Sequence, residues 1–356
     1  MGCVFISKRL WTDNPFIILN GGYNKMKRKC IILAVAVITA FSLCMSMTGC
    51  GGDSASSEGG DVAKLTIVQQ YGMAYAPLKV IEQKGLIEEN YDGDVEVNFQ
   101  TLNSGASIND AFVAGDVDVG LMGVAPAITG SLNEGVPYKI CTNISAQPHK
   151  LMTNDPEIKS LKDIGESDQI ALVNIGSIQH ILLAMACKEQ LGDAHALDNN
   201  IAAMAHPDGM TALLSGSVKC QLTTSPFVFK EAAEPGISEV EAIESVWPAG
   251  NSFIVAVAST ELYENNPDLY NAVLAAFGDA IAFINDDPEA AAEMLCADED
   301  VDAATYLEWL NDPACSYSTE LKGVSTMAKF MTDEGFLEGV EFNDISQLVY
   351  DGVVGD

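Results

Sequence analysis

Serine and glycine residues recur where a predicted strand gives way to a predicted helix, and this placement favours binding of a small ligand. The N–H groups at a helix start are free and carry partial positive charge, which suits an anion or a polar group. Glycine lets a ligand approach the backbone closely. The alternative is that these are ordinary turns, in which a serine such as Ser177 only caps its helix. The predicted site consists of Ser104, Gly105, Gly123, Gly176, Ser177 and Ser225, with Tyr71 and Phe227 as apolar walls.

The charge of the chain limits how such a site can work. After residue 50 the chain has 12 lysines against 49 acidic residues, a formal charge of −37. Its only arginines, Arg9 and Arg28, precede that point. So acidic a surface repels the phosphates of nucleic acids, which are therefore not expected as partners. Because arginine is the usual clamp for carboxylate or phosphate, a bound anion would have to be held by backbone amides, helix N-termini, hydroxyls or a lysine.

Cys50 ends a segment with the features of a secretory signal. A basic run over residues 26–29 precedes an uncharged apolar stretch over residues 31–47, and small residues lead to the cysteine. The cysteine resembles the lipobox of a bacterial lipoprotein, whose thiol is acylated. The alternative is a single transmembrane anchor, for which the apolar run is at the short limit. Residues 1–50 are therefore assigned to an upstream extension and signal, and the Gly/Ser-rich residues 51–61 to a flexible tether.

Strands and helices alternate through the rest of the chain, which predicts an α/β fold with largely parallel sheets. The C-terminal part, from residue 266 onward, is predicted to be mostly helical. The expected strands cover residues 65–70, 95–100, 117–122, 138–145, 169–175, 201–205, 219–224 and 253–258, and the expected helices residues 77–84, 108–114, 126–134, 178–191, 210–214, 226–234, 268–285, 288–295, 303–311 and 321–334. Pro77, Pro126 and Pro226 are each expected at the first helical position, and Ser177 and Ser225 as N-caps.

The cysteines and histidines indicate neither a metal site nor a cofactor. Their spacings match no zinc pattern, and His149, His180, His195 and His206 are scattered along the chain. Cys141 and Cys187 fall in apolar patterns typical of core residues. The sequence leaves open whether Cys296 and Cys315, near the ends of adjoining predicted helices, form a disulfide.

Five elements in order resemble the nitrate/sulfonate/taurine substrate-binding proteins of ABC transporters. Residues 77–86 resemble the family's first helix, with its Lys-Gly ending, and residues 109–120 its helix-turn-strand element. Residues 208–219 are similar to the equivalent element of the second lobe. Gly176-Ser177 and Ser225-Pro226-Phe227 resemble its ligand loops. The resemblance runs from about residue 65 to residue 337.

This resemblance implies a two-lobed periplasmic-binding-protein-like fold of type II, with the ligand cleft between the lobes. The first lobe would comprise residues 62–146 and the returning residues 247–356, and the second residues 147–246. The implied protein is a monomeric extracytoplasmic lipoprotein. It would capture a small anion such as an aliphatic sulfonate, taurine or nitrate by closing its lobes, and would pass it to an ABC permease. Its lipid would hold it at the outer face of the cell membrane.

Two departures from the sulfonate-binding pattern keep other ligands open. The body of the chain has no arginine, and its second-lobe strand reads Lys219-Cys220-Gln221. A branch of the family resembles the pyrimidine-precursor proteins of thiamine synthesis, which stack a neutral ring between aromatic side chains. Relatives of that branch are enzymes with a histidine beside a cysteine-rich motif. The chain has no clustered cysteine motif, P-loop or Gly-x-Ser-x-Gly sequence, so we do not expect an enzyme.

Overall fold

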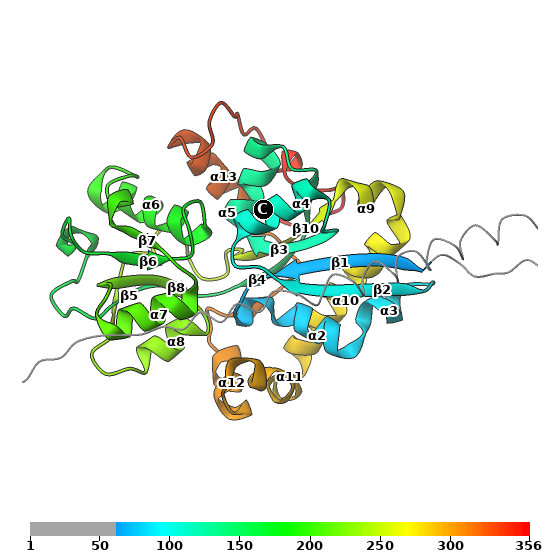
Figure 1. Cartoon of the computed structure of the whole chain (residues 1–356), viewed down its shortest axis with the longest axis horizontal. Coiled ribbons are helices and arrows are strands. Elements are labelled where there is room, and N and C mark those ends of the chain that lie inside the picture. Colours follow the sequence, from blue (N-terminus) through cyan, green and yellow to red (C-terminus); the bar gives the residue numbers. More distant parts are fainter. Residues whose placement is uncertain (1–61) are drawn as a thin grey trace, which may run out of the picture. The chain divides into compact units, whose positions relative to one another are not determined.

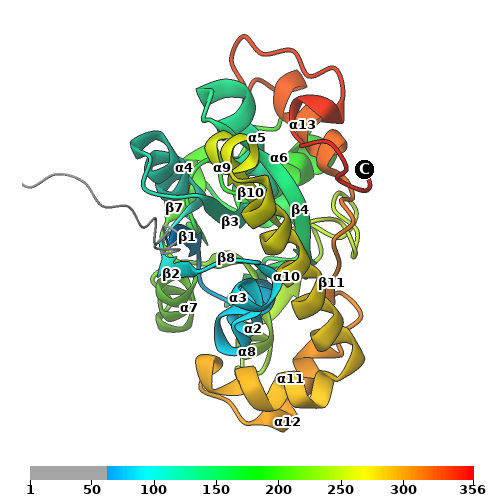
Figure 2. The same ribbon diagram turned by 90° about the vertical axis from the view of Figure 1, so that its right-hand side faces the viewer.

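The computed structural model describes residues 62–356. They fall within one compact unit, Gly59–Asp356. The predicted lipidation site Cys50 and the tether over residues 51–61 lie outside the described residues. Two β-sheets organise the unit, each with helices on both faces (Figures 1 and 2). We call the sheets and the helices packed on them the first and second lobes.

The sheet of the first lobe has the strand order β11-β4-β10-β3-β1-β2. Its strands are β1 (Ala63–Gln69), β2 (Val95–Thr101), β3 (Val119–Gly123), β4 (Tyr138–Ala146), β10 (Ile254–Ser259) and β11 (Ser316–Tyr317). β1 runs parallel to both β2 and β3, whereas β10 lies antiparallel between β3 and β4. Every residue of β3 and β10 is buried, because helices cover both faces of the sheet.

The sheet of the second lobe has the order β7-β6-β8-β5-β9. Its strands are β5 (His149–Thr153), β6 (Ile170–Leu172), β7 (Ile201–Ala203), β8 (Cys220–Thr224) and β9 (Ser238–Val240). β6 is parallel to β7 and β8, and β5 is antiparallel to β8 and β9. The chain therefore passes from the first sheet to the second between Ala146 and His149, and returns between Val240 and Ile254.

Helices cover the sheets as follows. In the first lobe α4 and α5 lie on one face and α2, α3 and α10 on the other, while in the second lobe α6 lies opposite α7 and α8 (Figure 1). The α-helices are α2 (Ala76–Lys84), α3 (Leu86–Asn90), α4 (Gly105–Ala114), α5 (Val124–Thr129), α6 (Ile178–Leu191), α7 (His206–Ser215), α8 (Phe227–Ala232), α9 (Thr260–Asn265), α10 (Pro267–Asp286), α11 (Pro288–Leu295), α12 (Ala303–Leu310) and α13 (Val324–Asp333). Shorter turns are η1 (Met73–Tyr75), η2 (Gly130–Glu134), η3 (Leu161–Asp163), η4 (Asp198–Asn200), η5 (Cys296–Glu299) and η6 (Ile345–Gln347).

Capping explains where several of these helices begin. The Ser104 and Ser177 hydroxyls accept hydrogen bonds from the third residues of α4 and α6, Ser107 and His180. All three proline predictions were wrong by one or two positions. Pro77 is the second residue of α2. α5 begins at Val124, two residues before Pro126, and α8 begins after Pro226, which is its N-cap. Ser225 therefore is not the cap of α8.

One described helix, α10, is long and apolar enough to cross a membrane. Half of its apolar window is buried, and the helix packs against α2 and α3. Its amphipathic pattern is that of a core helix, with Phe277 and Ala280 fully buried. The five cysteines of the described part are free, so Cys296 and Cys315 do not form a disulfide there.

Candidate functional site

Two adjoining cavities lie where the strands of both lobes end. The larger has a volume of about 450 Å³ and the smaller about 30 Å³, and they share Gln70, Tyr71 and Tyr75. The first lobe contributes residues that follow β1 and β2, and the second lobe contributes residues that follow β6, β7 and β8. Ligands of open α/β sheets bind beyond these carboxyl ends of the strands. The cavities are therefore the candidate ligand site.

Three helices begin at the smaller cavity. Gly105, the first residue of α4, lines it together with Ser177, the N-cap of α6, and Ala205, the N-cap of α7. Each helix has at least ten residues, so each start carries the partial positive charge of a full helix. Gly105 is required by packing, because a β-carbon there would lie 2.5 Å from the Cγ of Pro126. None of the residues that line the smaller cavity is an Asp, Glu, Lys or Arg.

Buried amide side chains at these cavities have unused hydrogen-bonding atoms. Gln179, which is 2% exposed, lines the smaller cavity, and its Nε2 has no partner within residues 62–356. In the same described part, Asn174 Oδ1 at the smaller cavity and Gln69 Oε1 at the larger one also lack partners. Since buried polar groups in folded proteins are almost always paired, these atoms are suited to a bound ligand or water.

His206 contributes the only imidazole among the residues that line the smaller cavity. It is 7% exposed, its Nδ1 lies 3.2 Å from the Thr223 hydroxyl, and its ring stacks on Phe227 with centroids 5.5 Å apart. Burial lowers the pKa of His206 to about 4, so the ring is neutral at pH 7. Burial also lowers the pKa of the neighbouring His149 to about 3, with the nearby His206 as a second cause.

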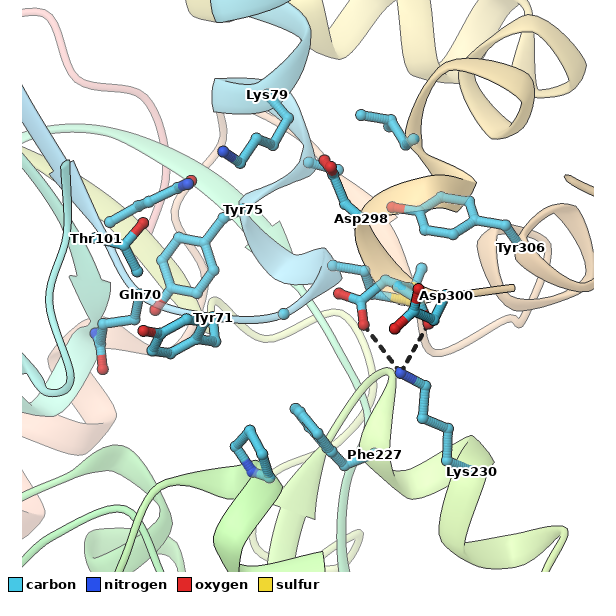
Figure 3. Close-up of a pocket in the computed structure, with 17 residues that line it drawn as sticks. Gln70, Tyr71, Tyr75, Lys79, Thr101, Phe227, Lys230, Asp298, Asp300 and Tyr306 are labelled. Carbon is cyan, nitrogen blue, oxygen red and sulfur yellow. Dashed lines mark hydrogen bonds and ion pairs between the residues drawn. The ribbon is translucent and has the colours of Figure 1, made fainter. Parts of the chain in front are cut away.

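The larger cavity mixes aromatic and charged groups. Figure 3 shows Tyr71 and Tyr75 from the first lobe across the cavity from Phe227 and Lys230 of α8. Tyr71 is 51% exposed, whereas Tyr75 is buried and its pKa is raised by that burial. The acidic turn Asp298–Asp300 and the two lysines Lys79 and Lys230 supply the charged part of the lining.

One ion pair at this cavity joins the two lobes. Lys230 Nζ lies 3.1 Å from the Glu299 carboxylate and donates a second hydrogen bond to the Glu299 carbonyl at 3.1 Å (Figure 3). Burial raises the pKa of Glu299, and the charge of Lys230 lowers it in part. Beside the pair, Phe229 of α8 stacks on Trp309 of α12 with centroids 5.7 Å apart. The lobes are thus in contact at this end of the larger cavity.

Four of the eight predicted site residues line these cavities. Tyr71 lines both, Gly105 and Ser177 line the smaller, and Phe227 lines the larger.

The other four, Ser104, Gly123, Gly176 and Ser225, line neither cavity. Ser104 caps α4, and a β-carbon on Gly123 would meet Ile178 at 3.2 Å. Gly176 has a positive φ of 81°, and its N–H donates to His180 Nδ1. Ser225 is fully buried and donates to Gln147 Oε1. For these four, a structural role replaces the direct lining role that the sequence suggested.

Several lining residues were not predicted. Asn103 and Asn174 lie in the strand-to-helix junctions already singled out, so attention to amides as well as hydroxyls would have found them. His206 was seen only as one of four scattered histidines. The acidic turn after α11 carries no local signal for a role at a cavity. Within residues 62–356, no group of three metal-ligating side chains is placed to hold an ion.

Comparison with known proteins agrees with this architecture. The model of the NMT1-like family matches residues 60–297. No curated protein matches the chain significantly.

Solved structures show the same fold at low sequence identity. The alkanesulfonate-binding protein SsuA from Xanthomonas axonopodis pv. citri, bound to MOPS, is 16% identical with a TM-score of 0.66, over 81% of this chain and 98% of that one. The Candida albicans CA3427 gene product, described as having the generic periplasmic binding protein fold, is 15% identical with a TM-score of 0.63, over 81% and 96%. The periplasmic nitrate-binding protein NrtA from Synechocystis PCC 6803 is 13% identical with a TM-score of 0.59, over 78% and 83%. These likenesses confirm the predicted two-lobed fold.

Proposed function

We propose that this chain, which belongs to the NMT1-like family, is the solute-binding receptor of an ABC importer and captures a small anion between its lobes. The proposed ligands are an aliphatic sulfonate, taurine and nitrate. The fold is shared with proteins described as sulfonate-binding and nitrate-binding, which supports the class of function. A receptor of this class binds its ligand without changing it, so we propose no catalytic role.

The convergence of three helix N-termini on one uncharged cavity carries this proposal. α4 of the first lobe and α6 and α7 of the second all begin there. Each contributes free N–H groups and roughly half an elementary positive charge. Because the described chain has no arginine, these helix starts take the place of the usual cationic clamp.

The larger cavity suits the remainder of such a ligand. With the anionic group at the helix starts, the rest of the molecule would extend past Tyr71 and Tyr75 toward the acidic turn Asp298–Asp300. That turn favours a ligand with a cationic or hydrogen-bond-donating far end over one with a second negative charge. Taurine, with its ammonium group, fits this polarity better than a dianion does.

The rest of the proposed mechanism follows from the two lobes. Closure would bend the chain near residues 146 and 246, with residues 147–246 moving against the first lobe. The closed receptor, a monomer, would then present its ligand to a membrane permease. The signal-like segment ending at Cys50 supports a lipid anchor at the extracytoplasmic face of the cell membrane.

A neutral aromatic ligand such as a pyrimidine is the second candidate, and the aromatic lining favours it. Tyr71, Tyr75 and Phe227 surround the larger cavity and could stack on a planar ring. The unused amide atoms of Gln69 and Asn174 could pair with its ring substituents. This reading leaves the three helix starts without an anionic partner, so we rank it second.

Isothermal titration of the purified protein with ethanesulfonate, taurine, nitrate and an aminopyrimidine tests these alternatives. We expect binding of at least one of the three anions and a smaller radius of gyration by X-ray scattering at saturation. The variant Ser259→Ala, which removes the cap of α9 and changes a residue that lines neither cavity, is the matched control and should bind normally. Tight binding of the pyrimidine alone, or binding with no change in radius, would contradict the proposal.

A further inference from the structure

We infer that His206 takes up a proton when an anion binds in the smaller cavity, and that the resulting imidazolium supplies a positive charge there. This inference rests on the proposed function, because it requires an anionic ligand. It assigns a specific role to a residue that the sequence alone did not single out.

The position of His206 is the first argument. It is the first residue of α7, and it lines the smaller cavity together with the starts of α4 and α6. Thr223 occupies Nδ1 at 3.2 Å, and within residues 62–356 Nε2 forms no hydrogen bond. Nε2 is thus the ring nitrogen left for a bound group. The Thr223 hydroxyl can donate to a neutral ring or accept from a protonated one, so protonation breaks no existing contact.

The charge of the cavity is the second argument. Three helix starts offer partial charges, but no side chain lining the smaller cavity carries a formal positive charge. An anion that has lost its hydration shell in such a site is stabilised by any full positive charge that can form beside it. Of the lining groups, only the imidazole can gain a positive charge between pH 5 and 8.

The groups around His206 explain why it is neutral before binding. Burial holds its pKa near 4. His149 of β5 is its titratable neighbour, and charge on one ring opposes charge on the other. Lys230 of α8 lies 5.6 Å from the Phe227 ring that stacks on His206, and Tyr71 and Tyr75 face it from the first lobe. On α7 itself the nearest acid is Asp208, which is exposed.

The linkage between proton binding and anion binding determines how affinity for the anion changes with pH. An anion beside Nε2 favours the charged ring and raises the pKa of His206 in the complex above its value of about 4 in the free protein. Between those two pKa values the complex holds one more proton than the free protein, and the proton comes from solvent. Affinity therefore increases as the pH falls, by up to about tenfold per pH unit in that interval, and is constant above it.

The test uses the purified protein and ethanesulfonate, whose charge does not change between pH 4.5 and 8. The pKa of His206 is measured by NMR of its ring nitrogens with and without saturating ethanesulfonate. Titration calorimetry in two cationic buffers of different ionisation enthalpy, Bis-Tris and imidazole, measures proton uptake without a competing sulfonate. We expect the pKa of His206 to rise by at least one unit and binding to consume protons as the pH approaches 5.

His206→Gln keeps a donor near the position of Nε2 but cannot titrate. It should abolish both the proton uptake and the pH dependence. His149→Gln and the exposed His195→Gln are matched controls that should keep both effects.

Three results would overturn the inference. An unchanged pKa of His206 in wild type at saturation would do so without any variant. Binding that does not depend on pH would also overturn it, because a neutral Nε2–H would then donate to the anion. The proposed function would stand in that case. If neither ethanesulfonate, taurine nor nitrate binds, the inference and the proposed anion both fall.

Discussion

The hydroxyl of Ser177 should be worth far more to ligand binding than to folding, and Ser177→Gly separates the two. Ser177 accepts from the His180 N–H at 3.3 Å, a long bond, and its backbone angles suit any residue. Replacing an N-cap serine by glycine costs only a few tenths of a kcal/mol. We therefore expect the melting temperature of Ser177→Gly to change by no more than about 1 °C.

The expected loss of affinity follows from hydrogen-bonding capacity. Ser177 is buried at the smaller cavity, and its oxygen is already used to accept from His180. The hydroxyl hydrogen remains free to donate to an anion. Losing one such bond of about 1.4 kcal/mol lowers affinity roughly tenfold.

The assay is titration calorimetry with the anion that binds wild type most tightly, alongside thermal unfolding of each variant. Ser259→Gly is the matched control, because Ser259 caps α9 with a 3.1 Å bond from Leu262 and lines neither cavity. It should lose similar stability and no affinity. If Ser177→Gly binds as tightly as wild type, Ser177 is only a helix cap and our placement of the anion is wrong.

Three further predictions concern other parts of the chain. Glu231 is 0% exposed, and within residues 62–356 neither of its carboxylate oxygens has a hydrogen-bond partner. Burial raises its pKa to about 8. Because the folded state then binds the proton more tightly than the unfolded state, stability should fall as the pH rises from about 4.5 to 8. In urea unfolding, Glu231→Gln should thus be more stable than wild type by roughly 3 kcal/mol at pH 7 and equal to it at pH 4.5. Equal stability of the two proteins at both pH values would refute this. Lys230→Met should weaken ligand binding about fivefold, because loss of the ion pair with Glu299 disfavours lobe closure by roughly 1 kcal/mol. If the double variant with Glu299→Gln loses the sum of the two single losses in binding free energy, Lys230 and Glu299 are not coupled. Cys50→Ser should release the protein from membranes or leave its signal uncleaved, and normal cleavage with unchanged membrane association would exclude Cys50 as the lipidated residue.

Elements with strong local signals were predicted closely. Helices α6 and α11 occupy the predicted residues 178–191 and 288–295, because a capping serine or proline marks each start and an apolar periodicity marks each body. The strands of the first sheet from β1 to β4 differ from prediction by one or two residues at their ends. Strands β5, β9 and β11 were missed. They are short, and pairing with distant strands, rather than their own sequence pattern, makes them strands.

Half of the predicted site residues line the two cavities, for a related reason. Residues at strand-to-helix junctions, such as Gly105 and Ser177, indicate a helix start in the sequence, and the fold brings these helix starts together. Gly123 and Gly176 also lie at strand-to-helix junctions. In the fold, however, Gly123 packs against Ile178, and the Gly176 N–H donates to His180. The acidic turn reaches the cavity only because α11 and α12 pack near α2 and α8, which no local pattern encodes.

Mass spectrometry of the small molecules released when the purified protein is denatured identifies the ligand that the cavities hold. The protein should be prepared in sulfonate-free buffer, and a variant with Gly105→Val, whose added side chain would clash with Pro126 beside the cavity, should be processed in parallel. We expect a stoichiometric small anion, such as an aliphatic sulfonate or taurine, from wild type and its loss from the variant. A neutral pyrimidine released in its place would contradict the claim that the converging helix starts hold an anion.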